Sequence, residues 1–137
     1  MKIKISVLLI VFGFFYGSGQ EELKENPQIK KGMIKVAIFY PDGEGKTFNM
    51  DYYSNKHMPM AASLFGDALK AMVIDKGLAN GTPHMPLKYV AIGYFYFDDI
   101  EAFKNAMGQN SDKLKADVPN YTNIIPELQI SELQTVE

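Results

Sequence analysis

One apolar segment decides the fold: residues 88–97 read KYVAIGYFYF. β-Branched and aromatic side chains fill most of its positions, which is typical of a strand. Alternate positions of a strand face opposite sides of the sheet, and here both sets are apolar. Because such a strand must be covered on both faces, the segment predicts a sheet buried on two sides. The two predicted sets are Val90, Ile92, Tyr94 and Tyr96 on one face and Tyr89, Ala91, Phe95 and Phe97 on the other.

The flanking segments make this the third of four predicted strands, which are interspersed with two predicted helices. Further strands are predicted at 33–40, 69–75 and 124–133, and Pro126 confines the last one to an edge or to strand entry. A helix follows the N-cap Asn49 and must kink or restart near Met58, because Pro59 cannot continue it. A second helix covers 100–107, with one more turn at 111–117. The order βαββαβ predicts an α+β fold of the ferredoxin-like type, an antiparallel sheet with two helices on one face.

The second face of the predicted sheet has no cover within the chain. Two helices cover one face only, so a second copy is the simplest partner for the other, which predicts a C2 homodimer. A monomer with one wetted sheet face is the alternative, and the aromatic content of residues 88–97 argues against it.

The first residues are typical of an export signal. Lys2 and Lys4 precede an apolar run over 5–16, and small residues follow at 17–19. A bilayer crossing needs about 20 apolar residues, so this run is too short for a permanent span. We therefore expect a signal peptide at 1–19, a flexible leader at 20–32 and one domain at 33–134, exported to the periplasm or secreted. An uncleaved membrane anchor and a buried N-terminal strand are the alternatives.

Composition excludes several classes of function. The 137 residues include no Cys, only two His, and 14 basic residues against 16 acidic ones, all of the basic ones Lys. Disulfides, thiolate nucleophiles and Cys-type zinc sites are ruled out, and two His are too few for an all-histidine metal site in one subunit. The acidic balance and the absence of Arg argue against nucleic acid and, after signal cleavage, against membrane surfaces. No metal and no bound cofactor is predicted.

A glycine-rich loop at 40–47 (YPDGEGKT) invites a phosphate-binding interpretation. The spacing would require Gly where Tyr40 stands, and Pro41 removes an amide that a phosphate nest would use. No Gly-x-Gly-x-x-Gly turn follows a predicted strand either, so nucleotide and dinucleotide binding are disfavoured.

The segment 51–60 (DYYSNKHMPM) holds the strongest candidate for chemistry. Tyr53 and His57 are four residues apart and share a helix face, while Pro59 frees backbone carbonyls beside the imidazole. A histidine can give or take a proton near neutral pH, and a neighbouring phenol can steer it or a substrate oxygen. A purely structural role, a hydrogen bond from His57 to a freed carbonyl, is the alternative. His84 lies in a Gly/Pro/Thr loop and is expected to be solvated.

Three stretches resemble the EthD family of the dimeric α/β-barrel superfamily. They are DYYSNKHMPM at 51–60, YVAIGYFYFDDIEAF at 89–103 and DVPNYTNIIPELQISEL at 117–133. The resemblance implies a ferredoxin-like protomer, a dimer that forms a β-barrel, and a pocket in each protomer between sheet and helices. Many members are labelled reductases, and relatives in the superfamily act as cofactor-free oxygenases, cyclases, isomerases or decarboxylases on aromatic and polyketide intermediates.

The family motifs fall on identifiable positions. The Tyr-Tyr-x-x-x-His-x-Pro signature matches Tyr52, Tyr53, His57 and Pro59, and the Pro-Asn-Tyr-Thr turn matches 119–122. Two departures stand out: Ile125 occupies a place where an acidic residue commonly precedes the Pro, and an export signal is unusual for the family.

The resulting hypothesis is a small-molecule enzyme, in one version an oxidoreductase, that acts on an aromatic or carbonyl compound. His57 is predicted to be the general acid/base, with Tyr53 as its catalytic partner. Any oxidoreductase step would rely on the substrate's own reactivity with oxygen or on a diffusible reductant. A non-catalytic exported carrier and a haem site through His57 are the alternatives. The residues expected to contact substrate are Tyr40, Tyr52, Met60, Phe97, Asn120 and Tyr121.

Overall fold

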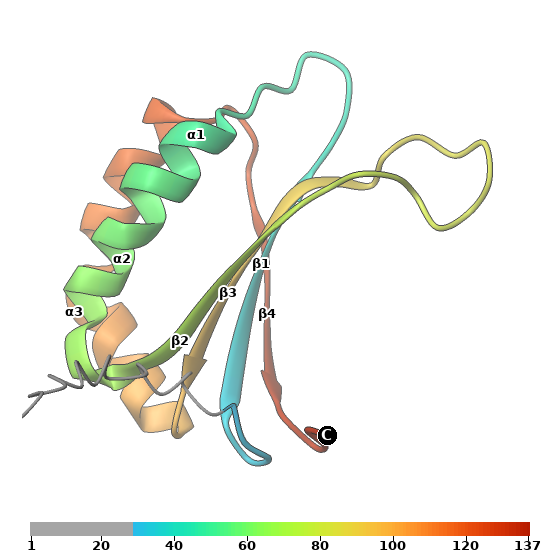
Figure 1. The fold of residues 1–137 in the computed structure, drawn as a ribbon. Coiled ribbons are helices and arrows are strands. Elements are labelled where there is room, and N and C mark those ends of the chain that lie inside the picture. Colours follow the sequence, from blue (N-terminus) through green and yellow to red (C-terminus); the bar gives the residue numbers. More distant parts are fainter. Residues whose placement is uncertain (1–28) are drawn as a thin grey trace, which may run out of the picture.

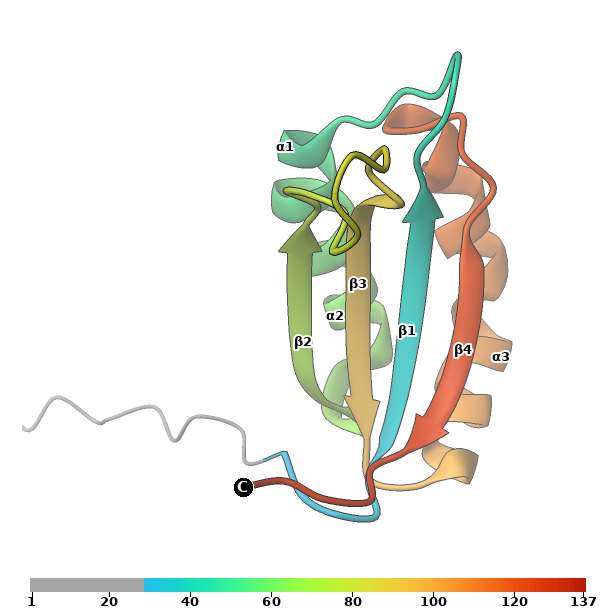
Figure 2. The same ribbon diagram turned by 90° about the vertical axis from the view of Figure 1, so that its right-hand side faces the viewer.

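The computed structural model describes residues 29–137, so the predicted signal peptide and most of the predicted leader lie outside the described residues. Four strands form one antiparallel sheet in the order β2-β3-β1-β4 (Figure 2). Their bounds are β1 Ile34–Pro41, β2 Leu69–Lys76, β3 Tyr89–Phe97 and β4 Glu127–Glu132. The helices lie on one face of this sheet (Figure 1), which confirms the α+β, ferredoxin-like fold.

The first helical segment runs from Met50 to Phe65 and changes its hydrogen bonding on the way. It consists of α1 (Met50–Tyr52), a π-helical turn η1 (Tyr53–His57) and α2 (Met58–Phe65). Asn49 caps its start, accepting a hydrogen bond from the Tyr52 amide as predicted. Pro59 falls in the first turn of α2, where a missing N–H is tolerated. The predicted restart at Met58 is therefore confirmed, and the π turn holds Tyr53 and His57.

The second helix, α3 (Ile100–Asp117), is longer than predicted. The sequence indicates a helix that ends at 107 with a separate turn at 111–117, but α3 continues through Gly108 without a break. Burial explains the difference, because Ala106 and Asn110 are buried against the rest of the fold and Asn110 donates a hydrogen bond to the Leu64 carbonyl of α2. The short turns η2 (Gly66–Ala68) and η3 (Val118–Asn120) complete the helical layer.

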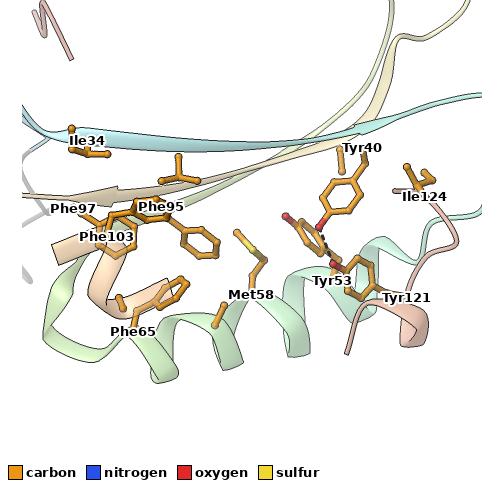
Figure 3. Close-up of a cluster of buried hydrophobic side chains, with 14 residues drawn as sticks. Ile34, Tyr40, Tyr53, Met58, Phe65, Phe95, Phe97, Phe103, Tyr121 and Ile124 are labelled. Atoms are coloured by element: carbon orange, nitrogen blue, oxygen red, sulfur yellow. Dashed lines mark hydrogen bonds between the residues drawn. The ribbon is translucent and has the colours of Figure 1, made fainter. Parts of the chain in front are cut away.

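The core fills the space between the helices and the inner face of the sheet. Val36, Phe95 and Phe97 contribute from β1 and β3, and Met58 and Phe65 contribute from α2 (Figure 3). At the end of the core near α1 the side chains become phenolic, with Tyr40, Tyr53 and Tyr121 gathered together. This phenolic end holds the candidate site.

The opposite side of the sheet, called the outer face below, carries no helix of residues 29–137 (Figure 1). One detail of the predicted faces is wrong. A register shift between Tyr40 and Pro41 moves Tyr89 to the outer face, where its ring lies 5.0 Å from that of Phe39, and turns Val90 toward the core. The outer face is formed mainly by Ala37, Phe39, Ala71, Val73, Tyr89, Ile92, Tyr94 and Tyr96.

No helix in the described part of the chain has the length and apolarity that a bilayer crossing requires.

Candidate functional site

His57 is held by a carboxylate from the end of the other helix. His57 is the last residue of the π turn η1, and Nδ1 of its imidazole lies 2.8 Å from Oδ2 of Asp117, the last residue of α3. The side chains are only 8% and 15% exposed, respectively. A carboxylate accepts hydrogen bonds only, so Nδ1 carries a proton, and in the neutral form of the ring Nε2 is the unprotonated nitrogen. Asp117 thus fixes both the tautomer and the orientation of the ring.

Asp117 is itself fixed by two further donors. The Tyr52 hydroxyl and the Asn120 side-chain amide each donate to its Oδ1 at 2.8 Å. Burial raises the pKa of this carboxyl, but hydrogen bonds from Asn120, His57 and Tyr52 outweigh burial, and the pKa lies below its usual value. Asp117 is therefore a carboxylate at neutral pH and does not compete with His57 for a proton.

Two phenols continue the chain of hydrogen bonds on the other side of the imidazole. The Tyr121 hydroxyl lies 3.3 Å from His57 Nε2 and 2.8 Å from the Tyr40 hydroxyl. Burial raises the pKa of both phenols, so both stay protonated. Since Nε2 can only accept in this tautomer, Tyr121 donates to it and Tyr40 donates to Tyr121.

The hydrogen-bonded residues His57, Tyr121 and Tyr40 all border an apolar cavity of about 170 Å³. The cavity lies between α3, α2 and the inner face of the β1/β4 side of the sheet. An engineered apolar cavity of about 150 Å³ holds benzene, so this one has room for a single ring. The cavity is lined by Ile38, Tyr40, His57, Ala61, Phe95, Met107, Ser111, Leu114, Lys115, Val118, Tyr121, Pro126 and Leu128.

The structure brings three of the predicted site residues to this cavity: His57, Tyr40 and Tyr121. Tyr52 and Asn120 do not line it and instead hold Asp117. These two residues are therefore placed to orient the imidazole, not to touch a ligand.

The remaining three predicted site residues do not line the cavity. Phe97 is buried at the opposite end of the core, beside Phe65 and Phe103. Met60 lies on α2 outside the cavity lining.

Tyr53 shares a helix face with His57, and the two rings stack with centroids 5.7 Å apart. Its hydroxyl, however, is buried without a hydrogen-bond partner. It lies against Gly93 of β3, where a Cβ would collide with it. Burial raises the pKa of this phenol far above its usual value. This geometry gives no support to the predicted catalytic partnership of Tyr53 with His57, because Tyr53 does not line the cavity and its hydroxyl lies against Gly93. The partnership stays a prediction.

Sequence reasoning missed Asp117 and the apolar walls of the cavity. Asp117 precedes Asn120 and Tyr121 by three and four residues, and this spacing at a helix end was the available signal. Most of the apolar walls come from α3 and the entry to β4, as seen in Met107, Leu114 and Pro126. Ile125, which stands where family members commonly carry an acidic residue, is 82% exposed and takes no part in the site.

Within residues 29–137, no three His, Cys, Asp or Glu side chains gather where they could hold a metal ion.

Comparison with known proteins assigns the family. The EthD domain profile matches residues 42–124. The chain belongs to the EthD family. The crystal structure of an EthD-like protein from Ralstonia eutropha JMP134 has 41% identity and a TM-score of 0.70, covering 75% of this chain and 93% of that chain. The resemblance inferred from the three motifs is thus confirmed.

A more distant structure shares the fold. An ethyl tert-butyl ether D (EthD) family protein from Bacillus halodurans C-125 has 23% identity and a TM-score of 0.51, covering 73% of this chain and 97% of that chain. A protein from Bacteroides fragilis NCTC 9343, described as dimeric, of unknown function and of ferredoxin-like fold, has 9% identity and a TM-score of 0.44, covering 77% of this chain and 100% of that chain. No curated protein matches the chain significantly.

Proposed function

We propose that this EthD-family protein binds a small cyclic molecule with a carbonyl or phenolic oxygen, and that His57 transfers a proton to or from it. The observation that carries the proposal is the position of His57 at the cavity: Asp117 holds Nδ1 at 2.8 Å, while the ring itself lines an apolar space of about 170 Å³. A base that is oriented by a carboxylate and faces a pocket is the usual arrangement for general acid/base catalysis.

Each polar group at the cavity has a distinct part in this proposal. Nε2 of His57 accepts a proton from carbon or oxygen of the ligand once the ligand displaces Tyr121 from it. Tyr121 and Tyr40, protonated and 2.8 Å apart, donate hydrogen bonds to the oxygen on which negative charge develops. Asp117 stabilises the imidazolium that forms, in the same way as a carboxylate behind a catalytic histidine.

An oxidoreductase reaction extends the same proposal. Removal of a proton from a ketone or a phenol leaves an enolate or a phenolate, which gives up electrons more readily than the neutral molecule. The electrons would pass to dioxygen or to another diffusible acceptor, because the sequence carries no motif for a tightly bound nucleotide cofactor.

The test uses cyclohexanone, a ring of suitable size, dissolved in D₂O. The rate at which its α-protons exchange for deuterium is followed by proton NMR with wild-type protein, with His57→Gln and with the matched control His84→Gln. We expect catalysed exchange by the wild type, a loss of about 10²- to 10⁴-fold in His57→Gln, and no change in His84→Gln. A bound ring whose exchange is no faster than in buffer would contradict proton transfer and favour the alternative, an exported carrier.

Two features outside the site remain proposals as well. We propose that the outer face is covered by a second copy, giving a homodimer, because Phe39, Ile92 and Tyr94 lie side by side on it with no helix of the described residues above them.

We also propose export through residues 1–19, which N-terminal sequencing of the periplasmic or secreted protein would test. A mature chain that begins near Gln20 is expected, whereas an intact Met1 in the cytoplasm would contradict export.

A further inference from the structure

The polar groups of the cavity come in two separate sets. The first set consists of His57, Tyr40 and Tyr121, which are joined by hydrogen bonds. The second set, Ser111 and Lys115, belongs to α3 and takes no part in that chain. The other lining residues are apolar.

Helix geometry separates the two sets. His57 is bound to Asp117 at the end of α3, whereas Ser111 lies six residues earlier, about 9 Å along the helix axis at 1.5 Å per residue. Side chains of an α-helix lean toward its N-terminus, so the lysine at 115 extends back over the turn of Ser111, four residues before it. From this lean, the ammonium group of Lys115 is expected toward the end of the cavity away from the imidazole.

Lys115 forms no ion pair with the described residues. The three ion pairs within residues 29–137 involve His57, Lys70 and Lys104, but not Lys115. Of the described residues that line the cavity, none is acidic. Lys115 is exposed where it borders the cavity, so an anion that pairs with it gains the modest energy of a surface ion pair.

We propose that the cavity selects a monocyclic carboxylate. Its ring fills the apolar space, its carboxylate pairs with Lys115 beside Ser111, and an oxygen at the other end of the ring meets His57 and Tyr121. The assignment of that second oxygen rests on the proposed function, whereas the carboxylate rests on Lys115 alone.

The test compares two probes of nearly equal shape and different charge, 4-hydroxybenzoate and 4-hydroxybenzamide. Their dissociation constants are measured by ligand-observed NMR titration with the wild type, with Lys115→Met and with Lys113→Met. Lys113 and Lys115 are both exposed lysines of α3, but only Lys115 lines the cavity, so Lys113 is the matched control.

We expect the wild type to bind the benzoate about fivefold more tightly than the benzamide, as for a single partly exposed ion pair. Lys115→Met removes this preference by weakening benzoate binding only, and Lys113→Met keeps it. The preference also shrinks as salt is raised, because an exposed pair is screened.

Equal affinity for the two probes in the wild type, or an equal loss of the preference in both lysine variants, would overturn the carboxylate assignment. Cyclohexanone exchange by His57 would be unaffected by that outcome, so the proposed function would stand. Conversely, an intact benzoate preference without His57-dependent exchange would support the carboxylate assignment and overturn proton transfer, leaving a carboxylate carrier.

Discussion

At the scale of single residues, Asp117 determines what His57 can do. It accepts a hydrogen bond from Nδ1 at 2.8 Å and is held in turn by Tyr52 and Asn120. Without the carboxylate the ring could rotate or take the other tautomer, in which Nε2 carries a proton and cannot act as a base.

Asp117 also makes the stability of the fold depend on pH. Because the folded-state pKa of its carboxyl is below the ordinary value, the carboxylate form stabilises the folded state. That contribution is complete above about pH 5 and is lost as the pH falls below about 4. We expect Asp117→Asn to lower the free energy of unfolding at pH 7 by about 1–3 kcal/mol and to lose less between pH 5 and 3 than the wild type does. Urea unfolding at the two pH values measures this, and parallel losses in both proteins would contradict it.

For Tyr53, in contrast to Asp117, we expect that removal of the polar group does not destabilise the fold. Its hydroxyl is buried with no partner, so removing it abolishes an unsatisfied polar group and leaves no new one. Tyr53→Phe should be as stable as the wild type or more stable by about 1 kcal/mol, and it should exchange cyclohexanone protons at the wild-type rate. A large loss of exchange with unchanged stability would restore the catalytic role that the sequence suggested for Tyr53.

Tyr53 and His57 show how much of the site could be predicted from the sequence. The four-residue spacing correctly placed Tyr53 and His57 on one helix face, and their rings do stack. The direction of the Tyr53 hydroxyl depends on the space that Gly93 leaves on a distant strand, and the partner of His57 is 60 residues away. Neither contact has a local signal, because both arise from the packing of separate elements.

At the scale of elements, the first helical segment and β3 fit together at one point. The absence of a side chain at Gly93 makes room for the Tyr53 hydroxyl and for the end of the Met58 side chain. A methyl group there would push the π turn away from the sheet and shift His57 with it.

We therefore expect Gly93→Ala to destabilise the fold by about 1–3 kcal/mol through overpacking. The double variant Gly93→Ala with Tyr53→Phe should recover part of that loss, since the clashing oxygen is gone. Thermal unfolding of the single and double variants measures both effects. Additive behaviour of the two substitutions would contradict the contact.

The elements themselves were largely predictable. The strand at 88–97 and the N-cap at Asn49 have strong local signals, and both appear nearly where they were expected. The length of α3 was not predictable, because Gly108 and the polar stretch after it weaken the local helical pattern, while burial of Asn110 against α2 maintains the helix.

At the scale of the whole molecule, the proposed homodimer depends on the outer face. Tyr94 lies at its centre, opposite Ala37 of β1 and Val73 of β2. We expect the wild type to be a dimer by sedimentation velocity at about 20 μM, and Tyr94→Lys to be a folded monomer, because a lysine there cannot be buried against a copy of itself. Val136→Lys, a matched change in the C-terminal tail, should leave the dimer intact. A monomeric wild type would contradict the proposal.

The proposed function depends on an unprotonated Nε2 of His57 that faces a bound ring, and imidazole ¹⁵N NMR observes this atom. The chain has only two histidines, so His84→Gln identifies the signals of His57. At about pH 9, where ordinary imidazoles are neutral, we predict that Nδ1 of His57 carries the proton and that the Nε2 signal moves when 4-hydroxybenzamide is added. A proton on Nε2, or an Nε2 signal that stays fixed while the ring is bound, would contradict proton transfer by His57.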